Sequence, residues 1–154
     1  MAAPKLPTAS ELRVSSFVKD EFLMDITQQY PGGLIDIPLS RSENTYVQQL
    51  FHKQPLLGGP GLNRVLPPEQ DLYYKKHLFF ASLEEWSNGG VPPSSLDRTS
   101  LKELIDDGFS LLIFHPKNSA MSLAEIEEYL GIKGIIHPRT KRAAFVLTDI
   151  LAAQ

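Results

Sequence analysis

The sequence predicts a single α/β domain whose mixed, mostly parallel sheet has about four to five strands flanked by helices. Apolar runs of strand length alternate along the chain with segments of helical apolar spacing. The 154 residues suffice for one domain with a real core, and 42% hydrophobic with 21% charged residues is an ordinary globular composition. We expect residues 15–154 to form this domain and residues 1–14 to be a linker or a domain boundary.

The first helix and the first strand are predicted from periodicity and from their stop signals. Apolar residues at intervals of four favour a helix over residues 16–29, which the Pro-Gly-Gly run at 31–33 ends. The short apolar run at 34–39 predicts a buried strand that ends near Pro38, because proline cannot donate to a strand ladder. Asp36 is the exception in this run, since both faces of a central strand are usually apolar.

A second helix and a third follow in the next part of the chain. Ser42 is a suitable N-cap for a helix that ends at His52-Lys53, where basic side chains complement the helix dipole. Residues 56–61 (LLGGPG) predict a short strand or turn followed by a loop. An apolar stripe then predicts a helix over residues 68–86.

The second half of the chain contains the clearest strand. Ser100 and Glu103 have capping-box spacing and predict a helix that ends before Gly108. Residues 109–115 (FSLLIFH) are apolar almost throughout, which predicts a central strand parallel to residues 34–39. A second capping-box spacing predicts a helix over 122–130. The last two predicted strands, 134–137 and 143–148, are joined by a basic turn at 138–142 and form an antiparallel hairpin at an edge.

Charge and composition exclude several classes of protein. The net charge of −3 is spread evenly along the chain, which argues against nucleic acid as a partner. The absence of cysteine excludes disulfides, thiolate nucleophiles and Cys-ligated zinc. No dinucleotide, phosphate-loop or zinc-protease motif occurs, and the four histidines lack ligand spacing, so we predict no cofactor and no metal. The apolar runs are too short for a membrane span, and the first residues lack the apolar core of a signal peptide.

One group of polar residues is a candidate ligand-binding site, because ligands of open α/β sheets collect beyond the carboxyl ends of the strands. His52 could act as an acid or base near neutral pH, and Arg41 could bind a carboxylate or phosphate. The alternative is structural: Asp36 bonds to backbone and is neutralised by Arg41, while the histidines cap strand and helix ends. The helix after a parallel strand also runs back, which can carry its last residues to the opposite end of the sheet. The candidate residues are Asp36, Arg41, Gln48, His52, Lys53 and His115.

Two short basic patches, Lys75-Lys76-His77 and the turn at 139–142, are expected to be solvated faces, with His77 exposed. Contact with membrane headgroups or with a partner protein is the alternative for both patches.

The order of several short motifs resembles the soluble C-terminal region of multi-spanning membrane glycosyltransferase-like proteins. The matching stretches are GLIDIPL, Tyr46-Val47-Gln48-Gln49, His52-Lys53-Gln54-Pro55-Leu56-Leu57-Gly58-Gly59, LKELIDDGFSLLIFH and GIKGIIHPRTKRAAFVLTDI. They follow one another in the family's order over nearly the whole chain. Gln54 is a departure, because the family pattern places proline directly after the lysine.

This resemblance implies a non-catalytic accessory or substrate-positioning domain on the extracytoplasmic face of the cell membrane. The catalytic carboxylate of such enzymes usually lies in the membrane part. The implied partners are the membrane-embedded portion of the same or a neighbouring protein, and a glycan or lipid-linked sugar. Two alternatives stay open: a free-standing cytoplasmic enzyme that uses Asp36, His52 and His115, and a structural subunit that contacts a larger assembly through residues 56–66 and the N-terminal segment.

Overall fold

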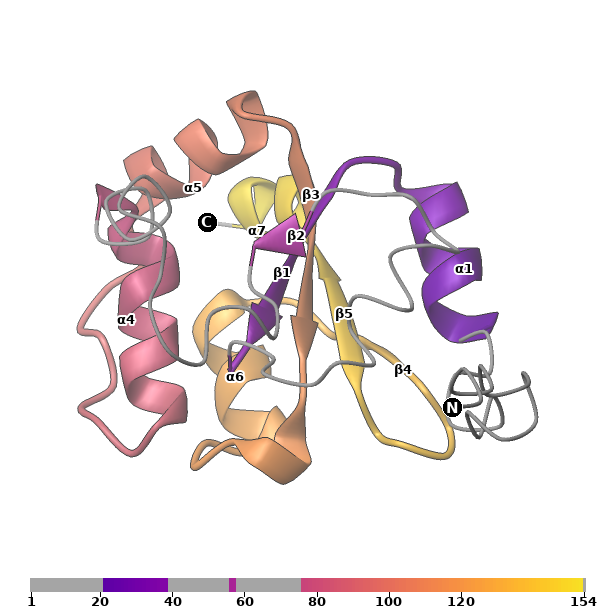
Figure 1. Ribbon diagram of the computed structural model, residues 1–154. Helices are drawn as coiled ribbons and strands as arrows, with labels where there is room; N and C mark the ends of the chain where they lie inside the picture. The colour runs from indigo at the N-terminus through magenta and orange to yellow at the C-terminus, as the bar shows by residue number, and fades with distance from the viewer. Residues whose placement is uncertain (1–20, 39–55, 58–75, 154) are drawn as a thin grey trace, which may run out of the picture.

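The computed structural model describes residues 21–38, 56–57 and 76–153, which form an α/β arrangement around one mixed sheet (Figure 1). The sheet has five strands in the order β2-β1-β3-β5-β4. The predicted α/β class is therefore confirmed. The elements are α1 (Glu21–Gln29), β1 (Gly33–Ile37), β2 (Leu56–Leu57), α4 (Leu78–Ser87), α5 (Arg98–Asp106), β3 (Phe109–Phe114), the 3-10 helix η3 (Pro116–Asn118), α6 (Leu123–Leu130), β4 (Ile135–Ile136), β5 (Ala143–Val146) and α7 (Leu147–Ala152).

The sheet is parallel on one side of β3 and antiparallel on the other. β1 is parallel to both β2 and β3, whereas β5 is antiparallel to both β3 and β4. The expectation of a mostly parallel sheet was slightly wrong. The short turn after β4 sends the chain back as β5, which enters the sheet between β3 and β4 and makes both of its pairings antiparallel.

β3 is the central strand and lies parallel to β1, as predicted. Asp36 is in register with Ile113, and Ile37 with Phe114. An almost wholly apolar strand is expected to be buried throughout. The last four residues of β3 are buried, whereas Phe109 and Ser110 are half-buried, so this expectation holds only for the second part. Apolar side chains on both faces of β3 explain why it occupies the middle of a covered sheet.

The glycines before β1 allow a close approach to β3. A Cβ atom at Gly33 would lie 2.6 Å from the Phe109 ring. Gly32 has φ +139°, and a Cβ atom there would lie 2.8 Å from the Gly108 carbonyl oxygen. The Pro-Gly-Gly run therefore ends α1 and also brings the start of β1 against β3.

The two faces of the sheet are covered by different helices. α1 lies on one face, and α4, α5, α6 and α7 lie on the other (Figure 1). The alternation of side chains along β1 and β3 separates the two cores, because neighbouring strand residues point to opposite faces. The core on the α1 face contains Ile26, Leu34, Leu111, Ile113, Ala144 and Val146. The larger core includes Ile35, Ile37, Phe79, Phe80, Leu83, Leu112, Phe114, Phe145 and Leu147.

The N-caps of α5 and α6 and the end of β5 can each be compared with the sequence predictions. The capping box of α6 is formed as predicted, with Ser122 and Glu125 bonded reciprocally. α5 instead uses Asp97 as its N-cap, and the buried Ser100 accepts a hydrogen bond from the backbone N–H of Phe79 at 3.1 Å. The strand predicted over 143–148 ends at Val146, because α7 begins at the next residue.

His77 is fully buried, which contradicts the expected exposed position. It precedes α4 and faces two carboxylates of the α5 region, with Glu103 at 3.6 Å and Asp107 at 3.8 Å from its ring nitrogens. Packing of α4 against α5 buries this histidine, whereas the adjacent Lys76 remains exposed.

Parts of two predicted helices, residues 16–20 and 68–75, and the whole of the helix from Ser42 to Lys53 lie outside the described residues. α4 ends at the Asn-Gly-Gly run, as predicted. Across segments 21–38, 56–57 and 76–153, no helix is long and apolar enough to cross a membrane.

Candidate functional site

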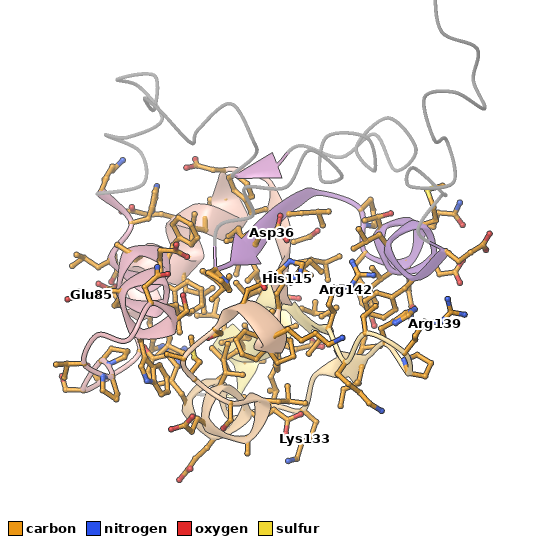
Figure 2. All side chains as sticks on the ribbon, turned by 60° about the horizontal axis from the view of Figure 1, so that its bottom comes forward. Asp36, Glu85, His115, Lys133, Arg139 and Arg142 are labelled. Atoms are coloured by element: carbon orange, nitrogen blue, oxygen red, sulfur yellow. The ribbon has the colours of Figure 1, made fainter. Side chains whose placement is uncertain are left out.

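Asp36 and His115 meet at the carboxyl ends of the two parallel strands. Asp36 is the second-last residue of β1, and His115 directly follows β3. Both side chains fall on the α1 face by alternation, and the His115 N–H donates to the Ile37 carbonyl at 2.9 Å. His115 Nε2 lies 2.7 Å from Asp36 Oδ1. The end of the central strand pair thus presents a fixed carboxylate–imidazole pair (Figure 2).

The chemistry of this pair follows from the donors and acceptors available. A carboxylate only accepts, so the Nε2–H of His115 donates to Asp36, and Nδ1 is the ring nitrogen that can accept a proton or a hydrogen bond. The Asp36 side chain is 8% exposed and the His115 side chain 20% exposed. The carboxylate is therefore largely enclosed, while a dissolved ligand can reach part of the imidazole.

Arg142 brings a cation to the same face of the sheet. The β3–β5 register ends with Ala143 opposite Phe114, so Arg142 directly precedes β5 where His115 directly follows β3. Figure 2 shows Arg142 beside His115, on the side toward α1. An arginine at this place can bind a carboxylate or phosphate with two parallel hydrogen bonds.

The turn before β5 holds Arg142 in position. The Arg142 Nε–H donates to Thr140 Oγ1 at 3.0 Å, and its guanidinium carbon lies 5.8 Å from the centroid of the Phe22 ring. His137 Nδ1 accepts from the Thr140 N–H at 3.0 Å, and its ring meets Phe22 edge to face. Phe22 belongs to α1, so this helix and the turn together orient the guanidinium.

The structure places two of the six predicted site residues together and leaves four undescribed. Asp36 and His115 are in direct contact, whereas the structural alternative expected a backbone partner for Asp36. Arg41, Gln48, His52 and Lys53 lie outside the described residues, so their convergence stays a prediction.

Sequence reasoning missed Arg142 as a site residue. It is half-buried, whereas Arg139 and Lys141 in the same turn are exposed as expected. The predicted hairpin at 134–148 contains Arg142 and was the only signal in the sequence. Finding Arg142 from it would also require knowing that β5, and not β4, lies beside β3.

The residues described offer no group of three or more His, Asp or Glu side chains placed to hold a metal ion. No protein-family model, curated protein or solved structure matches the chain.

Proposed function

We propose that this chain is a non-catalytic, substrate-positioning domain of a membrane glycosyltransferase-like protein, on the extracytoplasmic face of the membrane. Its ligand is a lipid-linked sugar, held at the carboxyl ends of β1 and β3, where Asp36 and His115 meet. The observation that carries the proposal is the 2.7 Å contact between His115 Nε2 and Asp36 Oδ1.

The position and polarity of this pair support ligand binding. A carboxylate in a strand of otherwise apolar residues is costly to bury, and a fixed partner offsets that cost. The pair lies at the carboxyl ends of the parallel strands, which is where α/β proteins bind their ligands. His115 Nδ1 can accept from a sugar hydroxyl, and Arg142 can bind the phosphate of a lipid carrier.

The resemblance to membrane glycosyltransferase-like proteins supports the rest of the proposal. In that arrangement the partner is the membrane-embedded portion of the same or a neighbouring protein, which supplies the catalytic carboxylate. Sequencing the gene upstream of the Met1 codon tests this part: membrane spans in the same frame or a neighbouring gene support it. A closed upstream frame with no membrane-protein gene nearby contradicts it.

Binding is tested by NMR titration of the labelled chain with a water-soluble, short-chain polyprenyl-phosphate sugar. We expect the amide signals of Asp36, His115 and Arg142 to shift, and His115→Phe to weaken binding. Arg142→Gln should weaken binding of the phosphate-linked sugar more than that of the free sugar. Lys102→Gln is the matched control, since Lys102 is an exposed cation on α5, across the sheet. Unmoved signals, or equal binding by His115→Phe, would refute the proposal.

The same contact favours a second candidate, a free-standing enzyme in which Asp36 orients His115 as a general acid–base. His52 is the third residue of that hypothesis. A turnover assay with the short-chain lipid-linked sugar separates the two: sugar release that His115→Phe abolishes supports the enzyme, and binding without release supports the positioning domain.

A further inference from the structure

A small pocket lies across the sheet from Asp36 and His115, between α4 and α6. Its volume is about 200 Å³, and it is lined by Trp86, Glu125, Glu128 and Tyr129. The two aromatic rings meet edge to face with centroids 5.7 Å apart. Two aromatic and two acidic residues therefore line one small pocket.

The walls of this pocket are held by hydrogen bonds outside it. The Tyr129 hydroxyl donates to the Ser95 carbonyl at 3.1 Å, which ties α6 to the loop after α4. The Glu125 carboxylate accepts from the Ser122 N–H at 2.6 Å. Trp86 is 9% exposed and belongs to the main core, so its indole is fixed by packing. The cavity is thus formed before any ligand arrives.

Acidic residues predominate in the segments that line the pocket. Residues 84–97 and 122–130, the two segments in which the four lining residues lie, contain six acidic residues and no Lys, Arg or His. Of these acids, Glu127 is neutralised by Lys133 at 2.8 Å. Burial and the nearby charge of Asp97 raise the pKa of Tyr129 to about 12. Figure 2 shows Glu85, next to Trp86, on the opposite side of the molecule from Arg139 and Arg142.

We propose that this pocket binds a small organic cation, an ammonium group held against Trp86 and Tyr129 and beside the acidic residues Glu125 and Glu128 that line it. Aromatic faces attract cations through their quadrupoles, and tryptophan does so most strongly. The carboxylates add Coulomb attraction that a neutral ligand of the same shape lacks. A pocket of about 200 Å³ has room for one ammonium group with small substituents.

The test uses the intrinsic fluorescence of Trp86, which is the chain's single tryptophan. Choline is titrated against 3,3-dimethylbutan-1-ol, which has nearly the same shape without the charge. We expect choline to change the emission saturably in the millimolar range and the alcohol to do so much more weakly. Equal responses to the two compounds, or no response to choline, would overturn the proposal.

A variant of Glu128 tests whether its carboxylate contributes to choline binding. Glu128→Gln should weaken choline binding about three- to fivefold, the effect of losing one exposed charge pair. Glu21→Gln on α1 is the matched control and should bind normally, as should His115→Phe, which separates this site from the sugar site. Unchanged affinity in Glu128→Gln, with native circular dichroism, contradicts the assignment. Titrations with glucosamine and with lysine amide then show whether an amino sugar or a lysine side chain is the better source of the ammonium group.

Discussion

Replacing His115 by phenylalanine tests how much of the fold's stability the Asp36–His115 contact provides. Phenylalanine keeps a planar ring of similar size and removes the Nε2–H that donates to Asp36. A hydrogen bond to a charged group contributes about 1.5–3 kcal/mol. His115 is 20% exposed, so water can partly replace the lost donor, and we expect a loss near 2 kcal/mol. For a domain of this size, the melting temperature should fall by roughly 4–8 °C.

The matched variant is His115→Gln, whose side-chain amide can donate to Asp36 from nearly the same place as Nε2. We expect it to lose less than about 1 kcal/mol, because the hydrogen bond is retained. Urea unfolding is followed by the fluorescence of the buried Trp86 and, independently, by circular dichroism.

A double-mutant cycle isolates the contact itself. Asp36→Asn and His115→Phe are measured alone and together, and we expect a coupling free energy of about 1–2 kcal/mol. Additive effects within ~0.5 kcal/mol would refute the conclusion that the two side chains stabilise each other. Equal losses in His115→Phe and His115→Gln would show that packing of the ring, and not its donor, matters.

Three other outcomes are expected. Leu112→Ala, at a fully buried position of β3, should lower the free energy of unfolding by about 2–5 kcal/mol in urea titrations; a loss below ~1 kcal/mol contradicts the central position of this strand. Ser122→Ala removes the N-cap of α6 and should cost about 0.5–2 kcal/mol, whereas alanine at the non-capping Ser94 serves as control and should change little. The pKa of Tyr129 is raised to about 12 in the folded chain, against about 10 in the unfolded chain. The contribution of the neutral Tyr129 phenol to the free energy of unfolding is therefore fully present below pH 10 and is lost as pH rises from 10 to 12. After allowance for solvent screening this loss is ~1–2 kcal/mol, and it should be absent in Tyr129→Phe; an equal alkaline loss in that variant contradicts the assignment.

Local signals in the sequence were sufficient for several elements. The apolar run at 109–115 predicted β3, and the Ser122–Glu125 spacing predicted the capping box of α6. The hairpin of β4 and β5 followed from two short apolar runs and a short turn between them. These features depend on residues close together in the chain, whose side-chain periodicity and capping chemistry act wherever the segment packs.

Contacts between distant segments required the folded chain. Asp36 and His115 are 79 residues apart, and their meeting depends on the exact register of two parallel strands. Periodicity shows which face of a strand a side chain occupies, but not which strand is its neighbour. Arg142 lies on the same face of the sheet because β5 inserts beside β3, and His77 is buried because α4 packs on α5. Such choices arise from packing of the whole core, where many weak non-local contacts act together.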